Sequence, residues 1–329
     1  MKILISDYKE SMMPDHDLEY EILKEGLGSD TEIEIFEYTD DKREEFLEKL
    51  SDADALLTAF VPIDKEAFGN AKNLKIISLN STGYDGVDIE EANKRGIGVS
   101  PVGEYCTSDV SEGALAFVFG LVKGLKHYQK EIEEDYVWDY SSPKPMPRVE
   151  SQVVGIIGLG KIGKCTAKKL QGLSKKVIAW DPYIDIKGTK EIGVEMVELS
   201  YLLNHSDIII NHMNLTKQNE NFFDKKKFDE MDQHPIFINM SRGQHIIQED
   251  LVAALDSGQI KAVGLDVLDK EHPDLQNHPL LNRKNVMVTP HSSFYSQDSI
   301  YQLEKISSEN IVFFLKGKRE KVFKLVNLQ

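Results

Sequence analysis

The sequence predicts an α/β protein with two doubly wound parallel β-sheets. Short runs rich in Ile and Val alternate along the chain with longer amphipathic stretches, and this alternation is typical of parallel sheets with helices on both faces. The strand-like runs fall into two series. A chain of 329 residues also exceeds what one hydrophobic core usually serves. These observations together favour two α/β domains.

The first series of predicted strands begins at the N-terminus. Its members are KILIS from Lys2, EIEIFE from Glu32, ADALLT from Ala53, LKIISL from Leu74 and GIGVSP from Gly96. Between the first two strands, the segment DLEYEILKEGL places Leu18, Ile22 and Leu23 on one face of a helix. We expect these segments to form the first sheet and its helices.

The second series begins at Val153 and comprises VVGIIG, KVIAWD, SDIIINH, PIFINM, IKAVGLDV and VMVTPH. An apolar helix, predicted over residues 108–128, separates it from the first series. An acidic segment with three prolines follows this helix. The segment is expected not to continue the helix and to form an arm beside the domain boundary.

A final helix follows the second series. Ile300, Leu303, Ile306 and Ile311 recur at helical spacing, and this helix is expected to pack back on the first domain. The predicted domains are therefore residues 1–103 with 293–329, and residues 104–292.

The composition excludes some classes of function. The chain has 39 Lys and Arg against 55 Asp and Glu, and its formal charge of −16 argues against binding to nucleic acid or to an anionic membrane. Cys106 and Cys165 provide no disulfide framework and indicate a reducing compartment. The first apolar run, residues 3–5, is too short for a signal peptide. We expect a cytoplasmic protein.

A glycine-rich motif, GIIGLGKIG, opens the second series. Gly158, Gly160 and Gly163 follow a predicted strand and open a predicted helix, with Lys161 and Ile162 between the last two glycines. The spacing alone is weak evidence, because about one chain in ten of this length shows it by chance at roughly 7% glycine. Its position between strand and helix is typical of a turn that binds a dinucleotide pyrophosphate.

An acidic residue ends the next predicted strand, KVIAWD. Asp181 stands where a carboxylate accepts hydrogen bonds from the adenosine ribose. A carboxylate there repels a 2′-phosphate, and the following PYIDIKG places no Arg beside it. The sequence therefore predicts NAD rather than NADP, with Lys187 as a surface lysine.

Three further polar residues follow later strands. Arg242 comes after PIFINMS, Glu271 after AVGLDV and His291 after VMVTP. Each alone has an ordinary structural interpretation, but ligands of α/β sheets bind outside the carboxyl ends of strands. A cation, an acid and an imidazole there suit the interconversion of a hydroxyl and a carbonyl group, which needs a proton donor and an electrostatic clamp.

The chain resembles the D-isomer-specific 2-hydroxyacid dehydrogenases over nearly its whole length. The matching motifs include STGYDGVDIEEANKRGIGVSP, YCTSDVSEGAL, GIIGLGKIGKCTAKKL, VIAWDPY, INMSRG, AVGLDVLDKEHP, HPLLNRKNVMVTPH and VFKLVN. The resemblance implies two Rossmann/flavodoxin-like domains with a cleft between them. It makes residues 104–292 the NAD-binding domain and the other segments the substrate domain.

The resemblance also implies roles for the three polar residues. Arg242 looks like the arginine that binds the substrate carboxylate and carbonyl, His291 like the catalytic acid/base, and Glu271 like its carboxylate partner. His272 stands where the family usually has Pro and is the competing partner of Glu271. Asn214 also stands where the family commonly has Pro. At the domain junction this chain has VSE, where the family usually has Val, Ala and an acidic residue.

Other residues are assigned by the same resemblance. Asp266 looks like the residue that binds the nicotinamide carboxamide, and Ser81, Thr82 and Gly83 resemble the loop whose N–H groups hold the substrate carboxylate. Three aromatic residues are candidates for the pocket lining or for ordinary packing: Phe60, Tyr84 and Tyr295.

The expected activity is NADH-linked reduction of a small 2-keto acid to a D-2-hydroxy acid, or the reverse, without a metal. The helix at 108–128 and the arm at Trp138 resemble the family's dimerisation region, which implies a homodimer. The alternatives are an NAD(H)-sensing, corepressor-like binding protein and a phosphoglycerate-type dehydrogenase. Formate oxidation fits less well, because that branch pairs its histidine with Gln.

Overall fold

The computed structural model describes residues 1–13, 15–184, 193–270 and 273–328, which form two compact units. Unit 1 comprises Met1–Tyr105 and Ser296–Gln329, and unit 2 comprises Cys106–Tyr295. The predicted boundaries follow residues 103 and 292, whereas the observed boundaries follow residues 105 and 295. Each unit is described below by itself.

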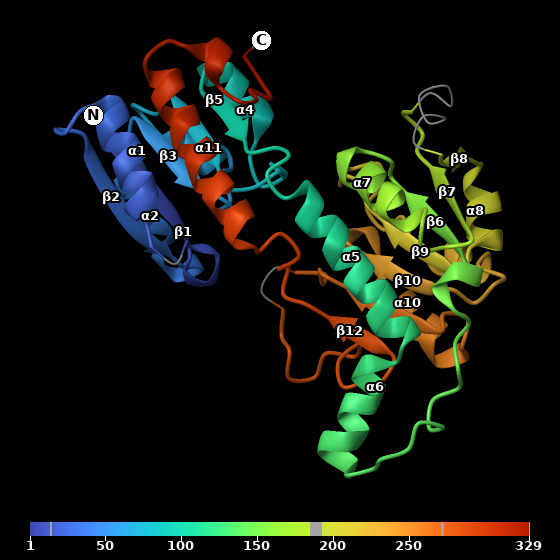
Figure 1. Ribbon diagram of the computed structural model, residues 1–329. Coiled ribbons are helices and arrows are strands. Elements are labelled where there is room, and N and C mark those ends of the chain that lie inside the picture. Colours follow the sequence, from blue (N-terminus) through green and yellow to red (C-terminus); the bar gives the residue numbers. More distant parts are fainter. Residues whose placement is uncertain (14, 185–192, 271–272, 329) are drawn as a thin grey trace. The chain divides into compact units, whose positions relative to one another are not determined.

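Unit 1 contains, among its described residues, a five-stranded parallel sheet with the order β2-β1-β3-β4-β5 (Figure 1). The strands are β1 (Lys2–Tyr8), β2 (Glu32–Tyr38), β3 (Ala55–Thr58), β4 (Ile76–Leu79) and β5 (Gly98–Pro101). Side chains alternate between the faces of a strand. Accordingly, Ile3 and Ile5 of β1 join one apolar cluster and Leu4 joins another.

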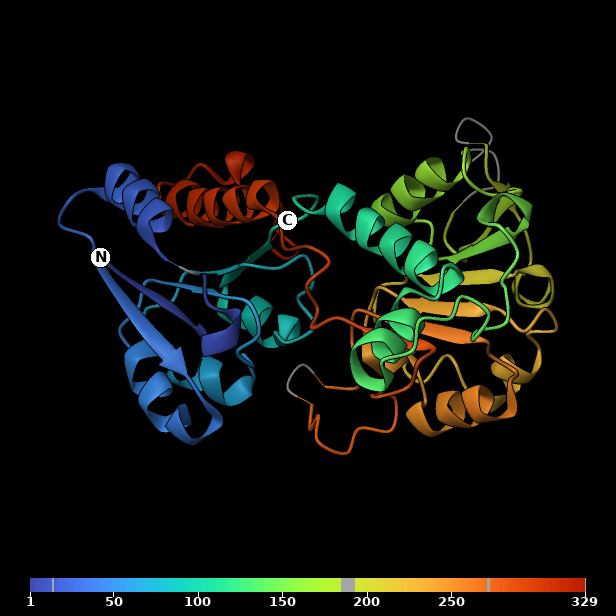
Figure 2. The ribbon, with the colours of Figure 1, turned by 60° about the horizontal axis from the view of Figure 1, so that its bottom comes forward.

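Helices cover both faces of this sheet (Figure 2). One face carries α1 (Asp17–Leu27) and α11 (Gln297–Leu315), and the other carries α2 (Arg43–Leu50), α3 (Lys65–Asn70) and α4 (Ile89–Arg95). The α1 and α11 helices pack closely, because a Cβ atom at Gly26 would lie 2.5 Å from Val312 Cγ2. The C-terminal helix thus packs on unit 1, as its apolar spacing predicts.

Unit 2 contains, within its described part, a seven-stranded parallel sheet with the order β12-β11-β10-β9-β6-β7-β8. Its strands are β6 (Val153–Ile157), β7 (Lys176–Trp180), β8 (Glu195–Met196), β9 (Ile208–Asn211), β10 (Ile236–Asn239), β11 (Ala262–Leu265) and β12 (Val286–Val288). The order of the strands reverses between β6 and β9. A doubly wound sheet binds its ligand at this reversal.

Helices also cover both faces of the second sheet. They are α5 (Thr107–Val122) and α7 (Lys161–Leu170) on one face, with α8 (Leu199–His205), α9 (Lys225–Asp229) and α10 (Gln248–Ser257) on the other (Figure 2). Gly264 of β11 allows α5 to approach, because a Cβ atom there would lie 2.8 Å from Phe117 Cδ1. The two doubly wound sheets confirm the predicted fold class.

The segment after α5 differs from the prediction. The expected helix over 108–128 is interrupted, because Gly124 has a φ of 62° and separates α5 from α6 (Leu125–Lys130). The acidic run is helical as far as Asp135, which corrects our expectation of a break before it. Lys130 pairs with Glu134 at 3.1 Å across one turn, and the first proline of the segment comes only later.

No helix among the described residues is both long and apolar enough to cross a membrane.

Candidate active site

The glycine turn between β6 and α7 has the geometry that dinucleotide binding requires. Gly158 has a φ of 88°, and a Cβ atom there would lie 2.7 Å from the backbone nitrogen of Met213. A Cβ atom at Gly163 would lie 2.2 Å from the carbonyl oxygen of Gly158. At Gly160 it would meet nothing within 4 Å. The first and third glycines therefore permit close packing, and the second leaves space for a pyrophosphate to approach the backbone.

Helix α7 begins at Lys161, directly after Gly160, so its first N–H groups and the positive end of its dipole face this space. Lys161 and Ile162 form its first turn. Asp181 follows β7, and its Oδ2 accepts a hydrogen bond of 2.8 Å from the N–H of Leu159. The structure thus places the predicted ribose acceptor against the glycine turn. Lys187 lies outside the described residues.

Arg242 lies in the loop after β10 and is half-buried. Its Nη1 donates to the carbonyl of Ser241 at 3.0 Å. The next residue, Gly243, packs against the loop after β11, because a Cβ atom there would lie 1.8 Å from the carbonyl oxygen of Leu268. The loop that carries Arg242 and the loop that leads toward Glu271 are therefore in direct contact.

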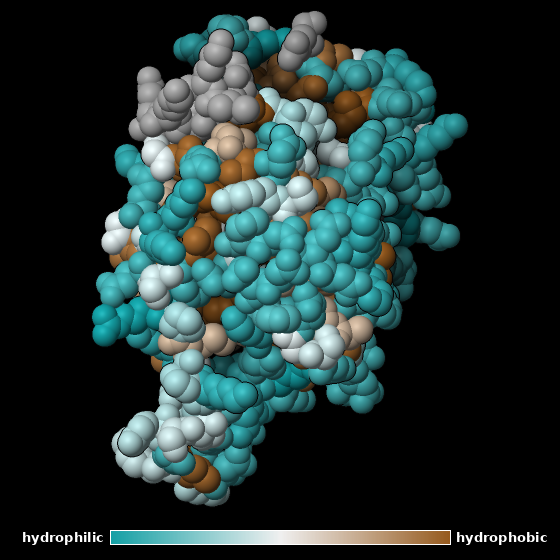
Figure 3. All heavy atoms as spheres, turned by 90° about the vertical axis from the view of Figure 1, so that its right-hand side faces the viewer, coloured by the Kyte–Doolittle hydropathy of each residue, from teal (hydrophilic) through white to brown (hydrophobic). Residues whose placement is uncertain are grey.

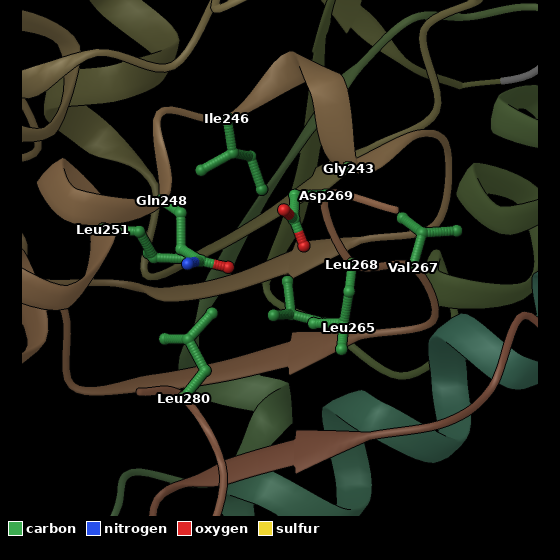
Figure 4. Close-up of a pocket in the computed structure, with 9 residues that line it drawn as sticks. All are labelled: Gly243, Ile246, Gln248, Leu251, Leu265, Val267, Leu268, Asp269 and Leu280. Carbon is green, nitrogen blue, oxygen red and sulfur yellow. The ribbon is translucent and has the colours of Figure 1, made fainter. Parts of the chain in front are cut away.

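A small pocket lies beside this contact (Figure 4). Its lining residues are Gly243, Ile246, Gln248, Leu251, Leu265, Val267, Leu268, Asp269 and Leu280. Only Gln248 and Asp269 have polar side chains, and Arg242 is not among them. An organic anion needs a positive partner in such an apolar setting, so this pocket belongs to the packing under α10 rather than to an anion site.

His291 lies on a loop that Asp266 organises. Asp266 is 2% exposed, and its Oδ1 accepts hydrogen bonds from the Thr289 hydroxyl at 2.6 Å and from the Ser292 N–H at 3.0 Å. The N–H of His291 donates to the Asp266 carbonyl at 2.7 Å, and His291 itself has a φ of 50°. The contacts of Asp266 are thus with the histidine loop. Its predicted role toward the nicotinamide carboxamide stays a prediction.

Glu271 and His272 lie outside the described residues, so the predicted pairing of Glu271 with His291 stays a prediction as well. Two other histidines lie after neighbouring strands of this sheet: His245 has no exposed surface, and His212 is half-buried. Burial lowers the pKa of His212 to about 3 and that of His245 to about 4. Both imidazoles are therefore neutral, and His291 stays the predicted acid/base at this edge of the sheet.

The predicted carboxylate-binding loop follows β4 in unit 1. Ser81 Oγ donates to the Gly83 carbonyl at 2.7 Å, and Thr82 Oγ1 donates to the Val102 carbonyl at 3.1 Å. Because these hydroxyl groups bond within the protein, the loop would bind an anion through its backbone N–H groups. The aromatic candidates differ in exposure: Phe60 is partly buried, whereas Tyr84 and Tyr295 are 39% and 60% exposed.

Several buried polar residues near these loops are not among the predicted site residues. Asn211, Asn239 and His245 have no exposed surface, although they lie at or just after the ends of β9 and β10. Asp7, at the end of β1 in unit 1, is 5% exposed. The available signal was a polar residue that ends an otherwise apolar strand, as in IIIN and IFIN.

Comparisons with known proteins agree with this geometry. The family model of the D-isomer specific 2-hydroxyacid dehydrogenase NAD binding domain matches residues 115–293. The hydroxypyruvate reductase of Blautia hydrogenotrophica is 35% identical over 83% of this chain and 86% of that protein. The glyoxylate reductase of Thermofilum pendens is 32% identical over 84% of this chain and 82% of that protein.

Solved structures share the fold. The D-lactate dehydrogenase of Aquifex aeolicus, complexed with NAD and lactic acid, covers 98% of both chains with a TM-score of 0.86 and 24% identity. These findings confirm the resemblance inferred from the motifs and confirm NAD as the cofactor. The protein is an NAD-dependent oxidoreductase, and the chain belongs to the D-isomer-specific 2-hydroxyacid dehydrogenase family.

Proposed function

We propose that the chain reduces a small 2-keto acid to the corresponding D-2-hydroxy acid with NADH. The observation that carries this proposal is the placement of Arg242 after β10 and His291 after β12. Both strands are parallel to β6, so both residues lie at the edge of the sheet that bears the glycine turn. The relatives named hydroxypyruvate reductase and glyoxylate reductase support a small substrate.

The proposed chemistry divides among few groups. Bound NADH supplies the hydride for the keto carbon. The imidazolium of His291 gives its proton to the carbonyl oxygen, and the cation of Arg242 stabilises the negative charge that develops there. Glu271 is the proposed carboxylate partner of His291. The N–H groups of residues 81–83 are proposed to hold the substrate carboxylate, and Asp266 to contact the nicotinamide carboxamide.

The test is a panel of 2-keto acids with different side chains, followed by NADH absorbance. We expect turnover with glyoxylate, hydroxypyruvate or pyruvate, and oxidation of D- but not L-2-hydroxy acids in reverse. Binding of NADH without turnover of any keto acid would instead support the corepressor-like alternative.

A phosphoglycerate-type activity is the second candidate. The D-3-phosphoglycerate dehydrogenase of Archaeoglobus fulgidus is 30% identical over 87% of this chain, but the match covers only 54% of that protein. This chain therefore spans about half of that relative. Faster oxidation of 3-phosphoglycerate than of unphosphorylated D-2-hydroxy acids would favour this candidate.

We also propose a homodimer built through the arm of unit 2. Tyr136, Trp138 and Tyr140 are 88%, 90% and 89% exposed, which is unusual for aromatic side chains of a monomer. Lys284 holds the base of the arm through Glu131 at 3.1 Å and Asp135 at 3.2 Å. Figure 3 shows the projecting arm with pale and brown residues below a mostly hydrophilic face.

The homodimer is tested by sedimentation of the wild type and of a Trp138→Ala, Tyr140→Ala variant. We expect a dimer and a monomer, respectively, and a monomeric wild type would refute the proposal.

A cytoplasmic location is proposed from Cys106 and Cys165, neither of which forms a disulfide.

A further inference from the structure

A buried amide network lies beneath Arg242. Asn211 and Asn239 end the neighbouring strands β9 and β10, where they are paired in register, and neither has exposed surface. Burying a polar side chain in a sheet is unfavourable unless its hydrogen bonds are made. The bonds of these two residues therefore show what they hold in place.

The amide of Asn239 holds the backbone on both sides of the Cα atom of Arg242. Its Oδ1 accepts a hydrogen bond from the N–H of Ser241 at 3.2 Å, and its Nδ2 donates to the carbonyl of Arg242 at 2.9 Å. Asn211 supports this amide, because its Nδ2 donates to Asn239 Oδ1 at 3.0 Å. The turn that carries the guanidinium group is thus fixed from below.

The network adds no charge beside Arg242. Asn211 Nδ2 lies 3.3 Å from Nδ1 of His245, and burial keeps the pKa of that imidazole at about 4. The backbone N–H of His245 also donates to the Arg242 carbonyl at 3.3 Å. Two amides and a neutral imidazole therefore surround the turn. The imidazole of His245 therefore adds no positive charge beside Arg242.

A second route leads from the network to the cofactor turn. Asn211 Oδ1 accepts from the N–H of Met213 at 3.1 Å, and Ser241 Oγ donates to the Met213 carbonyl. The backbone of Met213 in turn lies against Gly158. The network could therefore influence keto-acid chemistry through Arg242 or NADH binding through Met213, and these two routes have different kinetic consequences.

We propose that Asn239, supported by Asn211, is a positioning residue that holds Arg242 in its productive orientation. This inference rests on the role proposed above for Arg242. Small misplacements of a group that stabilises the transition state are expensive in rate. Asn239→Ala should therefore lower kcat/KM for the keto acid by about 10- to 100-fold, whereas the Kd of NADH should change by less than about twofold.

The decisive experiment is a double-mutant cycle of Asn239→Ala and Arg242→Ala. If Asn239 acts through Arg242, its substitution in the Arg242→Ala background should reduce kcat/KM by less than about twofold more. Additive losses in the double variant would overturn the proposal. So would a loss of NADH affinity that accounts for the fall in kcat/KM, since it would assign the network to the Met213 route.

Controls separate this proposal from the function on which it rests. A wild-type kcat/KM in Arg242→Ala would refute the proposed role of Arg242 itself. Asn285→Ala removes an amide that donates to the Lys261 carbonyl at 2.9 Å, on a loop at the opposite edge of the same sheet, and should leave kcat/KM within about twofold. If Asn239→Ala does not fold, Asn211→Ala decides: we expect a loss of about threefold to tenfold that vanishes in the Arg242→Ala background, and no loss would overturn the proposal.

Discussion

The two sheets differ in what lies at the point where their strand order reverses. In unit 1 the strand order reverses between β1 and β3, and the carboxylate of Asp7 lies there, where it accepts hydrogen bonds from the N–H groups of Ala59 and Phe60. In unit 2 the order reverses between β6 and β9, and the glycine turn lies there with open space at Gly160. One unit supplies its own anion to the backbone N–H groups, and the other leaves room for the phosphates of a ligand.

This difference shows how one topology serves two purposes. Both reversals direct loop N–H groups into a crevice, but a side chain satisfies them in unit 1. Asp7 is buried, and this burial raises the pKa of its carboxyl group to about 6. In unit 2 the carboxylate of Asp181 accepts hydrogen bonds from the N–H groups of Leu159 and Tyr183, and the first turn of α7 remains for the cofactor.

The largest expected effect concerns the imidazole of His291. A side chain that transfers a proton is proposed for the sheet edge of unit 2 and not for that of unit 1. His291→Ala should reduce turnover by on the order of 10²–10⁴-fold, the usual scale for a positioned acid/base, and leave NADH binding intact. Keto-acid reduction consumes a proton and hydroxy-acid oxidation releases one, so the balance between the two directions should shift toward oxidation as pH rises in the wild type. Near-normal turnover in His291→Ala would assign the proton to another group, with His272→Ala as the first variant to examine.

The second effect comes from a substitution that fills the open space at the glycine turn of unit 2. Gly160 has a φ of −67°, which any residue adopts, and a methyl group there meets no protein atom within 4 Å. Gly160→Ala should therefore keep the melting temperature but weaken NADH binding by about 100-fold. Gly172→Ala, which also meets nothing within 4 Å, is the matched control. Unchanged NADH affinity in Gly160→Ala would remove the turn from the binding site.

A smaller effect tests the acid beside that turn. Asp181→Asn keeps one acceptor oxygen for the N–H groups of Leu159 and Tyr183, which both bond the carboxylate, and removes the charge that repels a 2′-phosphate. We expect kcat/KM with NADPH to rise about tenfold relative to NADH. Wild-type enzyme that already uses both cofactors equally would contradict the role of Asp181.

The last of these effects is on stability rather than kinetics and concerns unit 1. The pKa of Asp7 is higher in the folded chain, at about 6, than its ordinary value of 3.8, so folding takes up a proton between these pH values. The wild type should therefore lose stability as pH rises from about 4 to about 7, by up to about 3 kcal/mol relative to Asp7→Asn. Glu304, whose pKa burial raises to about 7, is present in both proteins and cancels in the comparison. A pH-independent difference in melting temperature would show that Asp7 does not titrate in this range.

The sequence predicts the fold well because most strands are short apolar runs that turn residues bound. The interruption at Gly124 and the helical acidic run were missed, since local propensity near a domain boundary does not show where a helix bends. The two-residue strand β8 was also missed, because two residues carry no periodicity.

The candidate site was predicted less completely, for a different physical reason. Gly158, Asp181, Arg242 and His291 are recognised because each stands in a motif. The bonds between Asn211 and Asn239, or between Asp266 and Thr289, join residues on different strands and depend on the register of the sheet. Strand pairing cannot be deduced from a single polar residue at the end of an apolar run.

The most direct test of the account is the kinetics of Arg242→Lys with NADH and a keto acid that the wild type reduces. Lysine retains the charge but loses the planar pair of donors that grips a carboxylate and a carbonyl together. We predict that kcat/KM falls by on the order of 10²–10³-fold, with the Kd of NADH unchanged. Near-normal kinetics in this variant would show that Arg242 is an ion-pair residue of the loop and would contradict the proposed chemistry.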